Sequence, residues 1–210
     1  MAQGPLSVEM GTSRIPIRDA LKRLEGDGLV ISDAAGRHTV IQFSMRDVDE
    51  VYAIRRRLEP FAVEKAVEAM TSVAMTNIEL LFRRLGKAAE RRQLDRYSEI
   101  NQKFHMAIYE VSGMSRLVRM IRSLYIGVFP FTPIMLEGRV TRSQHEHEEV
   151  MARIAAGDAT GAARAMDRHI ENAAAELRRS IIGFAREGQP NRRPTTDLAL
   201  GYNDQKKRGK

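Results

Sequence analysis

Hydrophobic residues recur at helical spacing through most of the chain after Ser44. In the first such stretch Val51, Ile54 and Leu58 lie three or four positions apart, which places them on one face of a helix. We therefore predict a succession of amphipathic helices, bounded by capping residues, glycines and prolines. Their expected ranges are 44–69, 76–92, 94–111, 117–129, 143–157 and 158–185.

Two serines carry the spacing of a capping box, in which the serine side chain and an acidic side chain three residues later satisfy each other's backbone N–H groups. Ser44 is followed at that distance by Asp47, and Ser143 by Glu146. We expect one helix to begin at each of these serines.

A shorter amphipathic helix is predicted between Ser13 and Gly26. Ser13 can cap its N-terminus, and Pro16 falls in the first turn, where a missing N–H donor has little cost. One side of the helix is apolar, and a neighbouring arc of its surface stays free of packing contacts. The apolar side holds Ile17, Ala20, Leu21 and Leu24, and the free arc holds Arg14, Ile15, Arg18 and Lys22. A helix that buries one face and offers two arginines near its N-terminus suits the major groove of DNA.

This segment, from Gly11 to Leu29, resembles the GntR family of bacterial transcription regulators, whose winged helix-turn-helix carries a similar G-x-S-R-x-P-x-R-x-A-L-x-x-L-x-x-x-G-L pattern. Two β-prone runs, 29–31 and 39–41, follow it and flank a polar loop, which predicts a hairpin. In the family this hairpin is the wing, and Arg37 and His38 would lie at its tip. The residues that the resemblance implies in DNA contacts are Ser13, Arg14, Ile15, Pro16, Arg18, Arg37 and His38.

The family module has two helices before the recognition helix, whereas only ten residues precede the motif in this chain. Residues 6–10 can form the last turn of the second of these helices. Ile17, Leu21 and Leu24 would then lack most of their packing partners and leave an exposed apolar face. Two explanations stay open: the true start lies upstream, or the chain is a truncated form with an impaired DNA-binding module.

The expected fold is therefore mostly α. Residues 1–43 would form a partial winged helix-turn-helix, residues 44–185 an antiparallel all-helical bundle, and residues 186–210 a disordered tail. The bundle resembles the FCD ligand-binding domain of the FadR subfamily of GntR regulators. The matching stretches are Arg55-x-x-Leu58-Glu59, Phe104-His105, Glu146-His147 through Gly157-Asp158, and Met166-x-x-His169.

Two histidines are expected to face each other near the C-terminal end of the bundle. Gly157 and Asp158 predict a sharp corner between two antiparallel helices, because glycine can end a helix and aspartate can cap the next. His147 lies ten residues before Gly157, and His169 lies eleven after Asp158. With a rise of ~1.5 Å per residue, both lie ~15–17 Å from the corner. They should therefore be level across the seam between the two helices.

A third histidine, His105, lies on another predicted helix, one turn after Asn101. Three imidazoles completed by a carboxylate or an amide suit a divalent transition ion such as Zn²⁺ or Ni²⁺. In metal-binding FCD domains an Asp and three His coordinate the ion and leave positions open for a carboxylate effector. The chain matches the three histidines and has Asn101 where an Asp is usual, so a metal should bind more weakly. The alternative is that His105, His147 and His169 only hydrogen-bond one another or a ligand.

An organic effector would need a cationic or donor-rich wall. Arg55, on the first bundle helix, and Asn172, one turn after His169, are the predicted effector-binding residues. Each can equally be a structural hydrogen-bonding residue.

Composition narrows the class of protein. The formal charge is +7, but residues 1–40 hold five basic and five acidic groups, so overall charge is weak evidence for DNA binding. The absence of cysteine excludes disulfides and thiolate zinc sites. No apolar run is long enough to span a bilayer and the N-terminus does not have the pattern of a signal peptide. We expect a cytoplasmic protein without a membrane partner.

The leading prediction is a ligand-responsive transcription regulator that acts as a homodimer on double-stranded operator DNA and is not an enzyme. One alternative is a metal or metabolite sensor that does not bind DNA because of the truncation. A helical metal-dependent enzyme using the three histidines is the other, but no general base or nucleophile stands at motif spacing beside them.

Overall fold

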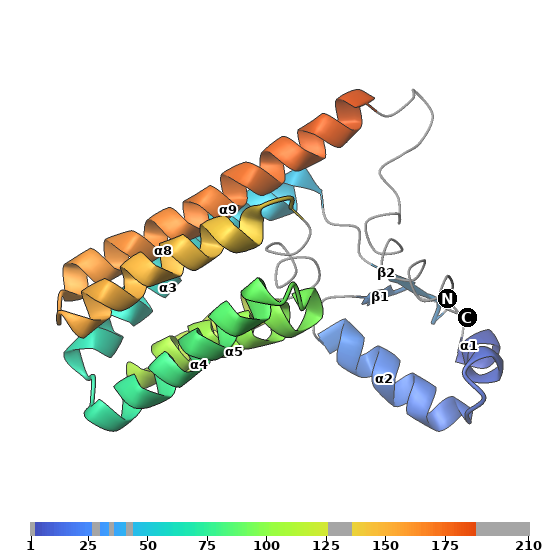
Figure 1. The fold of residues 1–210 in the computed structure, drawn as a ribbon. Coiled ribbons are helices and arrows are strands. Elements are labelled where there is room, and N and C mark those ends of the chain that lie inside the picture. The colour runs from blue at the N-terminus through green and yellow to red at the C-terminus, as the bar shows by residue number, and fades with distance from the viewer. Residues whose placement is uncertain (1–2, 27–29, 34–35, 41–43, 126–135, 188–210) are drawn as a thin grey trace.

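The computed structural model describes residues 3–26, 30–33, 36–40, 44–125 and 136–187, without the side chains of residues 181–187. Figure 1 shows long helices packed together over residues 45–187 and a smaller unit of two helices and a hairpin over residues 3–40. The expected mostly α fold is therefore confirmed, and the only sheet among the described residues has two strands.

The smaller unit contains helix α1 (Gln3–Glu9), helix α2 (Arg14–Gly26) and strands β1 (Val30–Ser32) and β2 (His38–Val40). The strands pair antiparallel, with Ile31 opposite Thr39, so the predicted hairpin is confirmed. Its small core consists of Ile17, Leu21 and Val30, all buried, because α1 and β1 both pack on α2.

This core corrects part of the expectation of an exposed apolar face. Ile17 and Leu21 are buried, since the short α1 and strand β1 cover them. Ala20 and Leu24, assigned to the same face, are exposed. Within the described part of the smaller unit, the apolar face of α2 is therefore narrower than the sequence pattern suggested.

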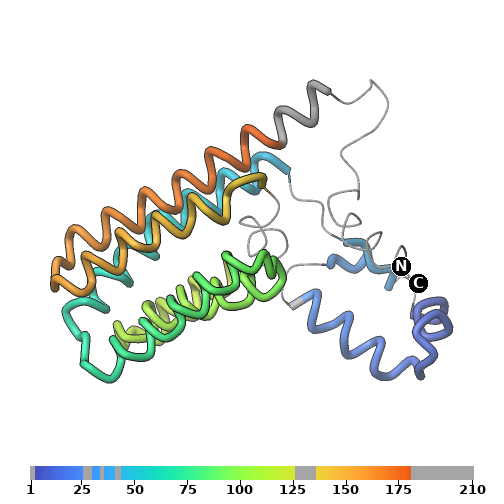
Figure 2. Tube along the Cα trace, in the orientation of Figure 1, coloured from blue at the N-terminus to red at the C-terminus, as the bar shows by residue number. Residues whose placement is uncertain are grey.

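The bundle consists of longer helices in two groups. Figure 2 shows α3, α8 and α9 lying side by side, with α4, α5 and α6 as the second group, and contacts of α3 with α5 and α6 join the two. The helices are α3 (Met45–Glu68), α4 (Ser72–Glu90), α5 (Leu94–Val111), α6 (Ser115–Leu124), α8 (Arg139–Ala155) and α9 (Ala159–Glu187). Apolar side chains from all six helices fill the interior between the groups.

One of the two predicted capping boxes is confirmed and the other is wrong. Ser44 caps α3: its side chain accepts from the Asp47 N–H, and the Asp47 carboxylate accepts from the Ser44 N–H. Helix α8 begins four residues before Ser143, after Gly138 with φ 67°. Ser143 is consequently buried inside the helix, and the Glu146 carboxylate binds other partners.

The predicted corner between α8 and α9 is confirmed. Gly157 has a φ of 68°, in the left-handed region that favours glycine. The Asp158 Oδ1 atom accepts a hydrogen bond of 2.8 Å from the Gly161 N–H, as an N-capping aspartate does.

Two predictions fall partly or wholly outside the described residues. The helix expected over 117–129 corresponds to α6, but positions 126–129 are not described. The tail expected to be disordered lies almost entirely in the range 188–210, which is also not described. Among the described helices, none combines the length and apolar character needed to cross a membrane.

Candidate metal centre and ligand pocket

Three helices bring His105 (α5), His147 (α8) and His169 (α9) together inside the bundle. All three side chains are buried, and one ring nitrogen from each lies within 4.8 Å of the others. The Nε2 atoms of His105 and His147 are 3.1 Å apart, and the ring centroids of His147 and His169 are 4.6 Å apart. The predicted convergence of the three histidines is confirmed, and we call this group the histidine triad.

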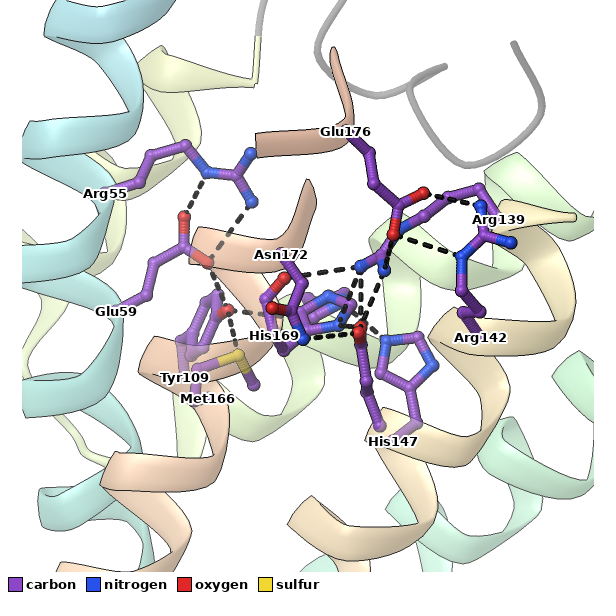
Figure 3. A network of polar contacts seen from close by, with 12 residues as sticks. Arg55, Glu59, Tyr109, Arg139, Arg142, His147, Met166, His169, Asn172 and Glu176 are labelled. Carbon is purple, nitrogen blue, oxygen red and sulfur yellow. Dashed lines mark hydrogen bonds and ion pairs between the residues drawn. The ribbon is translucent and has the colours of Figure 1, made fainter. Parts of the chain in front are cut away.

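The position of the triad follows from the α8–α9 corner. Because the turn at residues 157–158 is tight, His147 and His169 are level on neighbouring helices, and His105 reaches them from α5. Figure 3 shows His147 and His169 side by side, surrounded by carboxylates and arginines.

The donor set fits a transition-metal ion. Two imidazole nitrogens that share a Zn²⁺ ion at bond lengths of ~2.0–2.1 Å are about 2.9–3.4 Å apart for bond angles of 90–110°. The separation between His105 Nε2 and His147 Nε2 lies in this range. Asn101, one turn before His105 on α5, is buried, and its Oδ1 atom has no hydrogen-bond partner among the described residues. A buried carbonyl oxygen without a partner is costly unless something binds it.

Buried polar partners hold two of the three rings. The Nδ1 atom of His169 lies 2.7 Å from Glu146 Oε2, and the Nδ1 atom of His105 lies 3.0 Å from the Tyr109 hydroxyl. Such partners fix the orientation of histidine ligands in metal sites. The Nδ1 atom of His147 is buried without a partner among the described residues.

Arg139 holds Glu146 in place beside His169. This arginine is 1% exposed, and it forms ion pairs of 2.6 Å with Glu146 and 3.2 Å with Glu176. Arg142, which is half exposed, pairs with Glu176 from the outer side (Figure 3). Two arginines and two carboxylates thus form a continuous network beside the triad.

Burial favours the neutral form of the three histidines. It lowers the pKa of His105, His147 and His169, and the nearby Arg139 cation lowers it further, whereas the Glu146 carboxylate opposes the shift at His169. Burial raises the pKa of the Glu146 carboxyl, but hydrogen bonds from His169 and Arg139 outweigh it and hold the pKa at about 2. Neutral imidazole is the form of histidine that ligates metals.

Several buried polar atoms in and around the triad have no hydrogen-bond partner among the described residues. They lie on two helices, at positions four apart: on α5 Tyr97 Oη and Asn101 Oδ1, and on α8 Arg139 Nε, Ser143 Oγ and His147 Nδ1. Burial raises the pKa of the Tyr97 hydroxyl to about 12, and the nearby Ser143 hydroxyl opposes this rise. Because buried polar groups are normally satisfied, this concentration indicates a site for a polar ligand. We call these five residues the polar stripe.

Both residues predicted to bind an effector already have protein partners. Arg55 is 6% exposed, and it donates to Glu59 over 2.6 Å and to the Tyr125 hydroxyl over 3.0 Å. Asn172 Nδ2 donates to Glu146 Oε1 over 2.8 Å. Figure 3 shows each of them beside a carboxylate that supports the triad.

The structure also adds residues that the sequence did not single out. Glu59, Tyr109 and Arg139 are buried and contact the triad directly or through one partner. The Arg-x-x-Leu-Glu motif contains Glu59, which is the one signal that could have pointed to it. Nothing in the sequence around Arg139 marks it as buried.

The residues predicted to contact DNA are mostly exposed on α2. Arg14, Ile15, Pro16 and Arg18 lie in its first two turns, and Ser13 directly precedes it. The Arg18 guanidinium lies 3.4 Å from the carboxylate of the neighbouring Asp19.

The two wing residues differ from each other. Arg37 is exposed near the hairpin turn and pairs with Asp33 at 2.7 Å. The predicted position of His38 at the tip is wrong, because His38 belongs to β2 opposite Ser32 and is 5% exposed. The strand begins one residue earlier than its hydrophobic run, which turns this side chain inward.

Comparison with known proteins identifies the family. The model of the FCD domain matches residues 50–172, which is more than half of the chain. The chain belongs to the FCD domain-containing regulators of the GntR family. The predicted resemblance is therefore confirmed.

Relatives in the same family are named as transcription regulators. The chain is 31% identical to the HTH-type transcriptional regulator McbR of Escherichia coli strain K12 over 144 residues, covering 69% of this chain and 65% of McbR. It is 32% identical over 117 residues to the HTH-type transcriptional regulator YdhC of Bacillus subtilis strain 168, covering 55% of this chain and 52% of YdhC. The matches thus span less than two thirds of each relative. Both relatives are named as transcription regulators, as the sequence analysis predicted for this chain.

Solved structures support the same fold. E. coli McbR/YncC superposes with a TM-score of 0.75 at 25% identity, over 86% of this chain and 87% of that chain. The metal-free FCD domain of TM0439 superposes with a TM-score of 0.52 at 22% identity, over 68% of this chain and 99% of that domain.

Proposed function

We propose that the protein is a ligand-responsive transcription regulator that binds double-stranded operator DNA through α2. The observation that carries this proposal is the pair of exposed arginines, Arg14 and Arg18, in the first two turns of a helix that is followed by a hairpin. A guanidinium can donate two hydrogen bonds to guanine in the major groove. The McbR and YdhC relatives, named as HTH-type regulators, support the same role.

We further propose that the histidine triad and Asn101 hold a divalent transition ion, Zn²⁺ or Ni²⁺. Support comes from the neutral, buried imidazoles, from their spacing and from the unpartnered Asn101 oxygen. The arginines near the triad are already paired with Glu59, Glu146 and Glu176. A bound ion would therefore supply the positive charge that attracts a carboxylate ligand.

The effector proposed for this site is a small carboxylic acid. Its carboxylate would lie toward the ion, and its remaining polar groups would meet the polar stripe, whose hydroxyls and guanidinium Nε have no hydrogen-bond partner in the part of the chain that the structure describes. Arg55 and Asn172 would then act on the effector through Glu59 and Glu146 rather than by direct contact.

A homodimer is the proposed form on DNA, since two recognition helices related by a two-fold axis read a palindromic operator. Effector binding in each bundle would change the relative placement of the two helices. Light scattering on the full chain measures the oligomeric state, and a monomer at all concentrations would contradict this part.

The DNA proposal is tested by selecting bound duplexes from a random pool and measuring affinity for the enriched sequence by fluorescence anisotropy at a stated salt concentration. We expect an enriched, two-fold symmetric sequence. If no sequence is enriched while thermal melting still responds to Zn²⁺, the chain is a metal or metabolite sensor without DNA binding.

The effector proposal is tested by calorimetric titration of the Zn²⁺-loaded protein with acetate, lactate, malonate and citrate. Binding should require the ion and weaken in Ser143→Ala, which removes only the hydroxyl. Equal binding to metal-free and Zn²⁺-loaded protein would contradict a carboxylate bound next to the ion.

A further inference from the structure

A buried chain of hydrogen bonds reaches the histidine triad from α3. The Tyr109 hydroxyl lies 2.5 Å from Glu59 Oε2 and 3.0 Å from His105 Nδ1. All three side chains are at most 1% exposed, and Figure 3 shows the Glu59–Tyr109 contact directly above Met166. Bulk solvent therefore does not compete for the hydrogen bonds of these three side chains.

The number of available protons determines the direction of each bond. Glu59 is ion-paired with Arg55 and also accepts from the Tyr125 hydroxyl, so its carboxylate only accepts hydrogen bonds. The Tyr109 phenol carries one proton, and its oxygen lies nearer to the Glu59 carboxylate than to His105. Its single proton is directed to Glu59. The only hydrogen left for the contact between Tyr109 and His105 is one on His105 Nδ1.

We infer that Glu59 and Tyr109 act as positioning residues that hold His105 in the Nδ1–H tautomer, with the lone pair of Nε2 directed into the triad. A neutral imidazole carries one ring proton, so fixing it on Nδ1 leaves Nε2 free. The importance of this arrangement for a metal rests on the proposed function, because a metal needs that lone pair. The tautomer itself does not depend on any metal.

The orientation and ring proton of the three histidines are consequently fixed by different partners. His169 is fixed directly by Glu146, His105 is fixed through Tyr109, and the Nδ1 atom of His147 has no described partner. Without a metal, the 3.1 Å contact requires His147 Nε2–H to donate to His105 Nε2. Metal binding would therefore need the ring proton to relocate in His147 but not in the other two rings.

The experiment begins with the metal-free full chain. Two-bond ¹H–¹⁵N correlation spectra distinguish the protonated ring nitrogen of each histidine. We expect Nδ1–H at His105 in the wild type, and a shift toward Nε2–H in Tyr109→Phe, which keeps the ring in the core but removes the acceptor. Tyr125→Phe is the matched control, because it removes another hydroxyl bonded to Glu59 without touching His105; its His105 spectrum should match that of the wild type.

A second measurement uses Zn²⁺ competition against a chromophoric chelator. Loss of a partner of a metal ligand weakens binding by about 10–100-fold, which we expect for Tyr109→Phe but not for Tyr125→Phe. The inference is overturned if wild-type His105 carries its proton on Nε2, or if Tyr109→Phe leaves the tautomer unchanged. If the wild type does not bind Zn²⁺ at all, the metal proposal fails, while the spectra still decide the role of Glu59 and Tyr109.

Discussion

The two functional regions of this chain hold their polar side chains in opposite ways. On α2, Arg14 and Arg18 are exposed, come from one contiguous motif and have few protein contacts. In the bundle, the histidine triad is buried, comes from three helices and depends on further residues of α3 and α8. Exposed residues that read a large partner can be changed at little cost to the fold. Buried residues that enclose a small ligand are part of the core, so binding and stability are coupled there.

The largest expected effect is on metal binding. His147→Ala removes one of three imidazoles and should abolish the upward shift in melting temperature that Zn²⁺ produces, since a ligand stabilises the fold only by binding it. His145→Ala is the matched control, because His145 lies on the same helix but is exposed and pairs with Glu148. A Zn²⁺-dependent shift that survives in His147→Ala would contradict the site.

Changing Arg139 tests the coupling between binding and stability. Arg139→Met leaves Glu146 and Glu176 partly buried without their main cation, and breaking a buried pair costs about 3–5 kcal/mol. Arg142→Met removes a half-exposed partner of the same Glu176 and should cost at most about 1 kcal/mol. Urea unfolding of the metal-free variants measures both values. If both variants lose the same free energy of unfolding, burial of the arginine does not determine its contribution to stability.

The difference between local and long-range contacts explains what could be predicted from the sequence. Helical periodicity predicted α5 at its observed bounds, and the corner at residues 157–158 placed His147 level with His169, because both arguments use only local spacing. The positioning role of Tyr109 depends on Glu59, fifty residues away, and no local pattern reports such a contact.

The errors have a related cause. Ser143 and Glu146 have capping-box spacing, but the cap signal does not tell whether the helix has already begun, and here Arg139 starts it and pairs with Glu146. The hydrophobic run 39–41 predicts a strand that begins after His38 and leaves it at the wing tip. In the structure the pairing between β1 and β2 includes His38. In both cases, tertiary contacts determine the boundary.

The exposed region should respond differently to mutation. Arg18→Ala should weaken binding to the selected operator by ~1–3 kcal/mol and relax specificity at one base pair, because a bidentate contact to guanine is lost. Its urea unfolding should match that of the wild type, since Arg18 is exposed and its ion pair is with the equally exposed Asp19. Anisotropy against single-base operator variants makes the measurement. A uniform loss on all sequences would indicate a phosphate contact instead.

Asn101 allows the metal site to be strengthened rather than removed. Asn101→Asp places a carboxylate one turn before His105, where the buried amide oxygen has no hydrogen-bond partner among the described residues. The added negative charge should tighten Zn²⁺ binding by about tenfold and make the ion harder to remove with a chelator. Competition titration of both proteins makes the comparison. Unchanged affinity would mean that the side chain at position 101 does not reach the ion.

The smallest expected effect distinguishes the two serines with the same capping-box spacing. Ser44→Ala removes the side-chain acceptor of the Asp47 N–H at the start of α3 and should lower the free energy of unfolding by ~1 kcal/mol. Ser143→Ala removes a hydroxyl without a partner from inside α8, where alanine has the higher helix propensity, so stability should stay the same or rise slightly. Urea unfolding of the metal-free proteins measures both. If Ser143→Ala proves the more destabilising substitution, its hydroxyl has a structural partner, and its place in the polar stripe as a ligand contact is wrong.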